Sequence, residues 1–443
     1  MDKLNKATGL ILVAVILLSV FSTSIFLIQN SRTAEVFVGV TYCGNTVADG
    51  KLLIDKVKSY TNLFVLASGT IQRDLESVNE LGDYAVSKGM YFLPYFGNVI
   101  EVTFKAWLAE AKQRWGTHLI GVYYGDEFGG KMLDGYFSIK NQTTCNTITK
   151  TTYGDIVLQK ANGEVINYKR NGEIDYYKPN PLDENETTVY TLKADGAVNC
   201  HGSTPLTDAI TYESLMREKP FTNSEEISQE FVNVTASRIA FLKNETLVFT
   251  SDYALIWYDY FAGYDVVLGQ IGWNNSLAQQ IGFLRGAGNI QQKGWGVIIT
   301  WKYNQAPYLD TGENMLSQLA TAYRCGAKYL VVFNYADDES APHGTMKEEH
   351  FGALESFWNN VIKNVFITRN HTKANSVFLL PKNFGGGLRS RGDIIWGTQV
   401  LDPEANVWWD KLEIALAKDA YDLDIVYDDP YFNLNYNYQT IYR

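Results

Sequence analysis

The sequence predicts an α/β protein whose main domain is a TIM-type (β/α)8 barrel. Three observations predict this class. Eight short apolar runs of strand character follow one another after residue 35, and helical patterns alternate with them. These runs are apolar along their whole length, which is typical of parallel strands that are covered on both faces. No glycine-rich phosphate loop follows the first run, where the alternative arrangement, a doubly wound open sheet, would usually have one.

Eight strands of this kind can close into a barrel that has no exposed sheet edge. We predict the strands at residues 36–41, 63–67, 91–95, 119–124, 247–250, 266–270, 296–300 and 329–334. We predict the helices at residues 51–60, 75–88, 104–115, 225–242, 277–291, 314–324 and 347–363.

Before the first strand, residues 7–29 form a nearly unbroken apolar run. This run is long enough to cross a hydrocarbon layer of about 30 Å as a helix. Lys3 and Lys6 precede it, so the positive-inside rule places the N-terminus in the cytoplasm and the barrel outside. We predict a single-pass anchor within residues 1–32 of a cell-membrane protein. A cleaved signal peptide is the alternative, although residues 22–24 offer only a weak cleavage site.

Six Asn-X-Ser/Thr sequons are compatible with a glycoprotein that faces the outside of the cell. They lie at Asn141, Asn185, Asn233, Asn244, Asn274 and Asn370.

Residues 131–223 interrupt the predicted barrel domain, 33–370, after its fourth strand. Asn-Gly or Asp-Gly turns begin at positions 162, 171 and 195, between runs of strand character, which is a strong hairpin signal. The pattern predicts a β-rich insertion over the carboxyl-terminal mouth of the barrel, where active sites of this fold lie. Cys145 and Cys200 flank this insertion and could form a disulfide in an oxidising compartment.

Residues 371–443 predict an appended β-α-β module, with strands at 376–380 and 425–427 and a helix at 408–418. The two remaining cysteines are expected at opposite ends of the barrel. Cys43 follows the first strand, whereas Cys325 precedes the eighth. A disulfide requires Cα atoms within about 7 Å, so we predict that Cys43 and Cys325 do not pair.

Composition excludes several classes of function. The formal net charge of −11 would repel phosphate backbones, so no nucleic-acid partner is expected. With 5 His and 4 Cys and no H-E-x-x-H spacing, we expect no metal site and no cofactor. A G-x-S-x-G motif is missing, which disfavours a serine hydrolase. Aromatic residues make up 14% of the chain, and this high content suggests a role beyond core packing for some of them.

The positions just past the predicted strands are rich in acids, amides and aromatic residues. Aromatic rings stack on the C–H faces of sugar rings, and amides or carboxylates bind sugar hydroxyls. We therefore predict a carbohydrate as substrate or ligand, although core packing is the alternative for each aromatic residue. The predicted binding residues are Tyr42, Tyr95, Tyr124, Tyr253, Gln270, Trp273, Trp301, Lys302, Asn334 and Tyr335.

Cleavage of a glycosidic bond usually requires two carboxyl groups. Asp126 and Glu127 directly follow the fourth strand, where burial is costly without a functional reason and neighbouring carboxylates raise each other's pKa. We predict Glu127 as the general acid/base. The candidates for the second carboxyl group are Asp252, then Asp126, then Asp337 or its neighbour Asp338.

Each of these carboxyl groups also has a structural interpretation. Glu127 could form a buried ion pair with Lys302 or Arg285. Asp252 could cap a helix that starts after it. Residues 337–339 could form a solvated loop.

The segment from 121 to 130, GVYYGDEFGG, resembles a motif of poorly characterised (β/α)8 glycoside hydrolases. Many of these proteins have Asp-Glu-Pro at the end of strand four, and here Phe128 replaces the proline. In the largest clan of retaining barrel glycosidases the acid/base Glu also ends strand four, after an Asn where this chain has Asp126. The nucleophilic Glu of that clan ends strand seven, where this chain has Thr300-Trp301-Lys302-Tyr303.

The resemblance implies an extracytoplasmic glycoside hydrolase that acts on a glycan or polysaccharide. The missing acid at strand seven keeps an alternative open, namely a non-catalytic carbohydrate-binding or structural cell-surface protein built on a degenerate barrel.

Overall fold

The computed structural model describes residues 36–443 with short gaps. The gaps are 98, 137–144, 152–154, 181–182, 203–205, 207–209, 220, 222, 274, 336–342, 365, 398–402, 433 and 435–437. The chain divides into two compact units, one up to residue 134 and from 231 onward, the other from 135 to 230.

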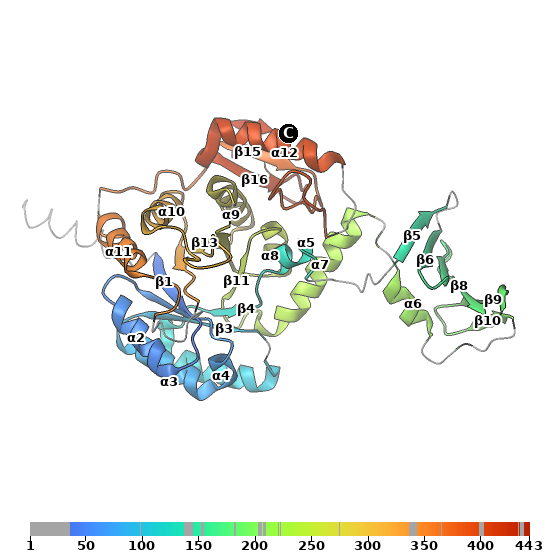
Figure 1. The fold of residues 1–443 in the computed structure, drawn as a ribbon, viewed down its shortest axis with the longest axis horizontal. Helices are drawn as coiled ribbons and strands as arrows, with labels where there is room; N and C mark the ends of the chain where they lie inside the picture. Colours follow the sequence, from blue (N-terminus) through green and yellow to red (C-terminus); the bar gives the residue numbers. More distant parts are fainter. Residues whose placement is uncertain are drawn as a thin grey trace, which may run out of the picture. The chain divides into compact units, whose positions relative to one another are not determined.

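In the first unit, eight parallel strands of the described chain close a barrel (Figure 1). They are β1 (Phe37–Tyr42), β2 (Leu63–Leu66), β3 (Tyr91–Phe96), β4 (Val122–Tyr124), β11 (Val248–Asp252), β12 (Val266–Ile271), β13 (Gly294–Ile299) and β14 (Tyr329–Val332). The strands follow one another around the barrel in chain order, and β14 pairs with β1 to close it. The predicted barrel and its eight strands are therefore confirmed, with boundaries that differ by a few residues.

Helices surround the barrel in Figure 1. They are α2 (Val47–Val57), α3 (Leu75–Ser87), α4 (Glu101–Trp115), α8 (Ile256–Ala262), α9 (Leu277–Gln291), α10 (Gly312–Arg324) and α11 (Glu348–Phe357), which continues as a π-helical turn to Ile362. The helix α7 (Ser224–Ile239) precedes β11 in the chain. Two short helices of this unit were not predicted: α8, and α5 (Phe128–Leu133) directly after β4.

Alternate residues of each strand fill the interior of the barrel. The interior cluster includes Phe37, Tyr123 and Phe249. Because successive side chains in a strand point to opposite faces, Ser251 on β11 faces inward like Phe249, whereas Asp252 faces outward. This alternation decides which of the polar residues at the strand ends can reach the mouth.

The second unit is a six-stranded antiparallel sheet with one helix, α6 (Tyr212–Glu218). Its strands are β5 (Cys145–Lys150), β6 (Ile156–Lys160), β7 (Val165–Tyr168), β8 (Ile174–Asn180), β9 (Asp183–Leu192) and β10 (Val198–His201). Gly163, Gly172 and Gly196 turn the chain between strands with φ of +83°, +88° and +87°, a conformation that favours glycine. The predicted hairpins are thus confirmed.

The order of this sheet bears on the predicted Cys145–Cys200 disulfide. The strands that contain these residues, β5 and β10, are the two edges of the sheet. Four strands about 4.8 Å apart lie between them, which argues against the bond. The side chain of Cys145 lies outside the described residues. Cys43 and Cys325 are free thiols, and they lie at opposite ends of the barrel strands as expected.

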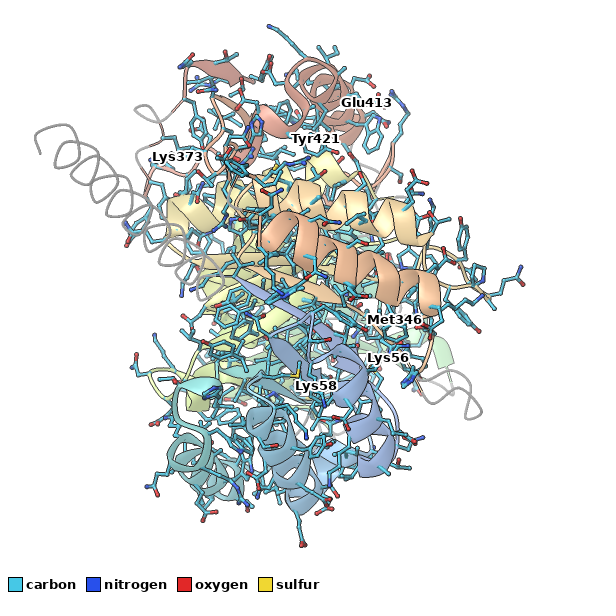
Figure 2. The ribbon with its side chains drawn as sticks, turned by 90° about the vertical axis from the view of Figure 1, so that its left-hand side faces the viewer. Lys56, Lys58, Met346, Lys373, Glu413 and Tyr421 are labelled. Atoms are coloured by element: carbon cyan, nitrogen blue, oxygen red, sulfur yellow. The ribbon has the colours of Figure 1, made fainter. Side chains whose placement is uncertain are left out.

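Residues after the barrel form a module that packs on α9. It contains β15 (Ser376–Leu380), α12 (Pro403–Asp419), β16 (Leu423–Tyr427) and β17 (Thr440–Tyr442). Its three parallel strands lie in the order β16-β15-β17, so the predicted β-α-β unit is found and β17 was missed. In Figure 2 this module, marked by Glu413 and Tyr421, lies at the top of the view, and Lys56 on α2 lies below the middle.

Buried contacts fix the module to α9. The guanidinium of Arg285 on α9 pairs with Asp424 on β16 at 2.7 Å, and both side chains are almost completely buried. On the same helix, a Cβ atom at Gly282 or Gly286 would lie 3.0 Å from a backbone oxygen of β16. The glycines therefore permit close packing of the helix on the strand.

No helix in the described part of the chain is both long and apolar enough to span a membrane. The predicted anchor, residues 7–29, lies outside the described residues and stays a prediction.

Candidate active site

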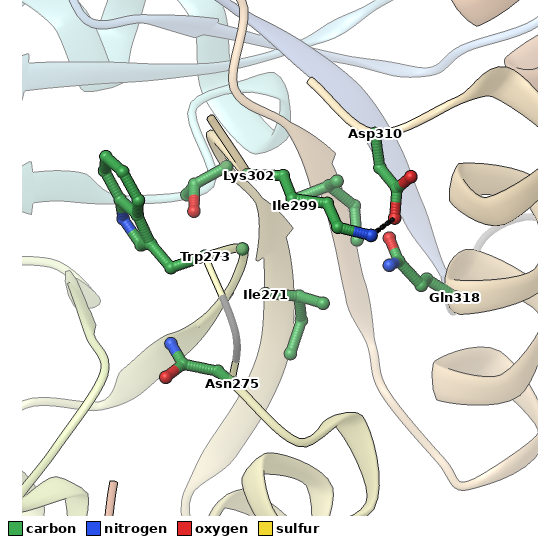
Figure 3. Close-up of a pocket in the computed structure, with 9 residues that line it drawn as sticks. Ile271, Trp273, Asn275, Ile299, Lys302, Asp310 and Gln318 are labelled. Carbon is green, nitrogen blue, oxygen red and sulfur yellow. Dashed lines mark hydrogen bonds and ion pairs between the residues drawn. The ribbon is translucent and has the colours of Figure 1, made fainter. Parts of the chain in front are cut away.

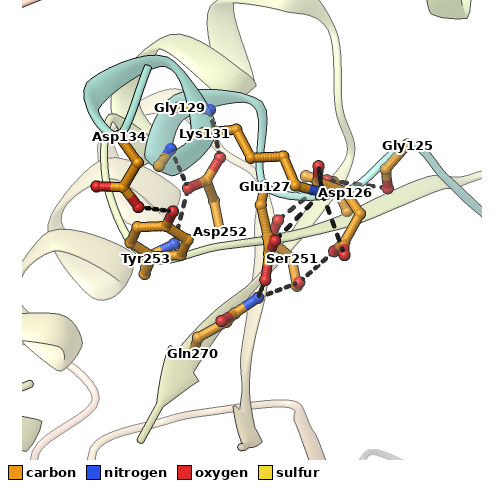
Figure 4. Close-up of polar contacts among 12 residues, drawn as sticks. Gly125, Asp126, Glu127, Gly129, Lys131, Asp134, Ser251, Asp252, Tyr253 and Gln270 are labelled. Atoms are coloured by element: carbon orange, nitrogen blue, oxygen red, sulfur yellow. Dashed lines mark hydrogen bonds and ion pairs between the residues drawn. The ribbon is translucent and has the colours of Figure 1, made fainter. Parts of the chain in front are cut away.

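Two polar sites lie side by side at the carboxyl ends of the barrel strands. One is a pocket after β12 and β13 (Figure 3). The other, which we call the carboxyl cluster, consists of Asp126, Glu127, Lys131, Ser251 and Gln270 (Figure 4). The cluster brings together β4, β11, β12 and the short helix α5.

Asp126 is held by two hydroxyl groups. Its Oδ1 accepts hydrogen bonds from Tyr123 Oη at 2.7 Å and from Ser251 Oγ at 2.6 Å. Burial raises the pKa of Asp126 to about 6, and the charge of Glu127 adds to this increase, whereas the two hydroxyl groups and Lys131 oppose it. Asp126 therefore exchanges its proton near neutral pH, as a general acid or base should.

Glu127 occupies an unusual backbone position. Its φ of 59° and ψ of 37° lie in the left-handed region, which is uncommon for residues other than glycine and often marks functional sites. Its Oε1 accepts a hydrogen bond from Gln270 Nε2 at 2.5 Å, and its Oε2 lies 3.2 Å from Lys131 Nζ. One quarter of its side chain remains exposed.

The ion-pair partner of Glu127 differs from both predicted candidates. Lys302 pairs with Asp310 at 3.0 Å, and Arg285 pairs with Asp424. Lys131 is the partner, and its i,i+4 spacing from Glu127 at the start of a helix is a sequence signal that could have identified it.

Lys131 also links the two carboxyl groups. Its Nζ lies 4.0 Å from Asp126 Oδ2 and donates to the backbone oxygen of Asp126 at 3.1 Å. One ammonium group thus faces two adjacent carboxyl groups. Such a pair can retain one proton while the other group is charged, because two neighbouring carboxylates repel each other.

Asp252, the first candidate for a second carboxyl group, is bonded to backbone N–H groups. It is fully buried, and its carboxylate accepts backbone hydrogen bonds from Gly129, Gly130, Tyr253 and Ala254 at 2.7, 2.8, 2.7 and 3.0 Å. Burial raises the pKa of Asp252 to about 7, and the four donors oppose this. Asp252 therefore caps α5 rather than a helix that follows it, and its predicted catalytic role stays a prediction.

Some of the predicted binding residues do lie at the mouth. Gln270 joins the carboxyl cluster, and Tyr95 faces inward beside Tyr123, with ring centroids 5.1 Å apart. Trp273 and Lys302 line the neighbouring pocket. Tyr335 is 39% exposed.

Other predicted binding residues hold loops or fill the core. Tyr42 is buried, and its hydroxyl donates to the backbone oxygen of Thr46. The amide of the buried Asn334 donates to the His343 oxygen and accepts from the Met346 N–H.

The last three predicted binding residues make aromatic or polar contacts within the protein. Tyr124 packs edge-on against Phe241 and is buried. The Tyr253 hydroxyl donates to Asp134. Trp301 packs against Tyr308 and Tyr335. The remaining acidic candidates, Asp337 and Asp338, lie outside the described residues.

Three residues of the carboxyl cluster or its support were not predicted from the sequence: Tyr123, Ser251 and Lys131. The alternation of inward and outward residues along β4 and β11 was the available signal for Tyr123 and Ser251. It would have selected Ser251 for the mouth and excluded Asp252.

No family model matches this sequence, and no curated protein matches it. Solved structures of low similarity include pneumococcal StrH, whose description concerns N-glycan recognition and hydrolysis. It has 11% sequence identity to this chain and a TM-score of 0.34, and the match covers 75% of this chain and 84% of that chain. A GH26-CBM35 β-(1,4)-mannanase from Podospora anserina has 7% identity over 78% and 65%, with a TM-score of 0.30.

A truncated 3-deoxy-D-arabino-heptulosonate 7-phosphate synthase from Thermotoga maritima is similar at 7% identity over 73% of this chain and 84% of that chain, with a TM-score of 0.31. Glycoside hydrolases are thus among these structures, together with an enzyme of a different activity. Likeness at this level of identity and TM-score shows nothing about the function of this chain.

Proposed function

We propose that this protein is a glycoside hydrolase that cleaves a glycan or polysaccharide outside the cell. The observation that supports it is the Asp126–Glu127 pair at the carboxyl end of β4, where the pKa of Asp126 is about 6 and Lys131 faces both groups. A carboxyl group that titrates near the working pH is the most effective general acid or base.

In the proposed reaction, the carboxyl pair donates a proton to the glycosidic oxygen as the C–O bond breaks. The remaining carboxylate stabilises the positive charge that develops on the sugar ring or directs the attacking water. Tyr123 and Ser251 hold Asp126 for this task, and Gln270 and Lys131 hold Glu127.

We also propose that residues 7–29 anchor the protein in the cell membrane with its N-terminus in the cytoplasm. The support is the length of the apolar run and the preceding Lys3 and Lys6. The full chain should stay in the membrane pellet after an alkaline carbonate wash, and a chain that begins at Thr33 should leave it. Release of the full chain by the wash would contradict the anchor.

The alternative function is binding of carbohydrate without cleavage. It is favoured by the end of β13, which has Thr300 and Trp301 where an acid would be expected, and by the buried capping role of Asp252. A screen of the detergent-solubilised full chain on a glycan panel decides between the two. Hydrolysis that is lost in Glu127→Gln supports the enzyme. Binding without hydrolysis supports the alternative, and hydrolysis that survives this change removes Glu127 from the mechanism.

A further inference from the structure

The short helix α5 depends on contacts at both of its ends. It comprises only the residues Phe128–Leu133, whereas an isolated helix needs roughly 12–15 residues to be stable in water. The carboxylate of Asp252 accepts the N–H groups of its first turn. Asp134 is the residue that follows its last turn. The contacts of Asp134 therefore decide how firmly the far end of the helix, and with it Lys131, is held.

The C-terminal module supplies the contact at that end. Arg389, in the loop between β15 and α12, donates from Nη1 to Asp134 Oδ1 at 2.6 Å. The hydroxyl of Tyr253 donates to the other carboxylate oxygen of Asp134 (Figure 4). The guanidinium of Arg389 also lies over the Tyr253 ring, with its Cζ atom 5.7 Å from the ring centroid. A single side chain of the module thus contacts both groups at the end of α5.

Arg389 is itself held in place from within the module. Its Nε and Nη2 atoms donate to the two carboxylate oxygens of Asp393 at 3.1 and 2.8 Å, which is a bidentate ion pair. Asp393 also accepts the backbone N–H of Arg389 at 3.1 Å. Because this pair fixes the planar guanidinium, Nη1 is presented to Asp134 in one orientation. Arg389 is therefore able to position its partner rather than follow its movements.

The loop that carries Arg389 also packs directly on α5. A Cβ atom at Gly387 would lie 2.8 Å from the side chain of Leu133, and one at Gly397 would lie 2.3 Å from the backbone oxygen of Met132. Leu388 has a φ of 50°, in the left-handed region that is costly for a leucine and persists only where the surrounding structure maintains it. The loop thus keeps a conformation in which its backbone approaches the helix closely.

We propose that Arg389 is a positioning residue of the active site: it holds the end of α5, and through this helix it keeps Lys131 facing the carboxyl pair. Lys131 Nζ lies 3.2 Å from Glu127 and 4.0 Å from Asp126, so a small movement of α5 changes both contacts. The C-terminal module is then part of the catalytic site rather than an accessory. The effect on catalysis depends on the proposed function, whereas the placement of Lys131 is measurable without a substrate.

The test follows the titration of Asp126, because the charge of Lys131 lowers the pKa of this carboxyl group. Infrared spectroscopy of the full chain in detergent records the carbonyl band of protonated aspartic acid, and the part that Asp126→Asn removes belongs to Asp126. We expect Arg389→Met to raise the pKa of Asp126 from about 6 to about 7, as loss of a nearby opposite charge does. Lys131→Met should have the same effect. Arg389→Lys, which keeps the charge but loses the planar fork, should have a smaller one.

Arg391→Met is the matched control. Arg391 lies in the same loop and carries the same charge, but it pairs with Asp410 and Glu413 on α12. Its removal should leave the titration of Asp126 unchanged.

Asp134→Leu separates positioning from a direct effect of charge. Removal of a negative charge by itself lowers the pKa of a neighbouring carboxyl group. If Arg389 acts through Asp134, however, Asp134→Leu also releases α5 and should raise the pKa of Asp126, as Arg389→Met does. Circular dichroism shows which variants are folded, and Asp134→Leu and Arg389→Lys decide the question if Arg389→Met is not.

An unchanged Asp126 titration in folded Arg389→Met would overturn the inference, as would shifts of opposite sign in Arg389→Met and Asp134→Leu. Hydrolysis of the glycan panel is measured separately. In Arg389→Met we expect kcat to fall at least about tenfold with KM within about threefold, because the catalytic groups are misplaced. A shifted titration without hydrolysis by the unmodified chain would refute the enzyme and retain the placement of Lys131 by Arg389. Hydrolysis with an unchanged kcat in Arg389→Met would refute only the positioning role.

Discussion

At the scale of single residues, the chemistry depends on two adjacent carboxyl groups with different surroundings. Asp126 accepts two hydroxyl hydrogen bonds, whereas Glu127 contacts an amide and an ammonium group. Burial and the neighbouring charge bring the pKa of Asp126 to about 6. The state of this pair therefore changes within the range of pH at which an enzyme works.

The first prediction concerns activity. Glu127→Gln should lower kcat about 100-fold or more, because general acid–base groups contribute at least that much. As pH rises through about 6 the pair loses its proton, so kcat/KM of the unmodified chain should fall above that pH. In Asp126→Asn, kcat/KM should no longer fall as the pH rises through this range. Glu413→Gln, an exposed glutamate in α12, serves as the control, and an unchanged profile in Asp126→Asn would contradict the assignment.

The second prediction concerns stability. The pKa of Asp126 is raised above its ordinary value of 3.8, so the folded protein binds this proton more tightly and loses stability as pH rises toward 6. Asp126→Asn should therefore raise the free energy of unfolding at pH 8 by about 1–3 kcal/mol. Its oxygen can still accept from Tyr123 and Ser251. Denaturant titrations at pH 8 and pH 4 should show a gain that shrinks at the lower pH, and a gain of equal size at both would refute this cause.

At the scale of elements, α5 depends on a residue far away in the sequence. Asp252, at the end of β11, accepts the N–H groups of Gly129 and Gly130 in the first turn of α5. A Cβ atom at Gly130 would lie 2.1 Å from the ring of Tyr253, so the contact also requires glycine. This cap positions the turn that carries Glu127 and Lys131.

The third prediction tests this cap. Asp252→Ala leaves four buried N–H groups unpaired and should lower the free energy of unfolding by about 3–5 kcal/mol. Asp252→Asn should lose less, because its oxygen can still accept three of these donors. Denaturant unfolding measures both. A normally stable Asp252→Asn protein without activity would instead show that Asp252 is catalytic.

At the scale of the whole molecule, the C-terminal module is joined to the barrel through buried charge. Arg285 donates to Asp424 and to the backbone oxygens of His371, Tyr421 and Leu423. These four hydrogen bonds join the guanidinium group to residue 371, to residue 421 and to residues 423–424 on β16. The module should therefore unfold together with the barrel.

The fourth prediction follows from this contact. Arg285→Met leaves Asp424 buried without its partner and should cost about 3–5 kcal/mol of stability. The double change Arg285→Met with Asp424→Leu should recover much of the loss, because no unpaired charge remains. Thermal unfolding and limited proteolysis after residue 370 report the effect. A single variant as stable as the parent would show that the ion pair does not hold the module.

The sequence alone determined the positions of the barrel strands, because continuous apolar runs between helices have few other ways to be buried. It also located the Asp126–Glu127 pair, since two adjacent acids after such a run stand out. The tertiary structure decided which groups each of the acidic side chains contacts. Gln270 reaches Glu127 across 143 positions of sequence, and Asp252 turns away from the mouth to cap α5. Such contacts depend on strand register and side-chain direction, and a one-residue difference reverses the face on which a side chain lies.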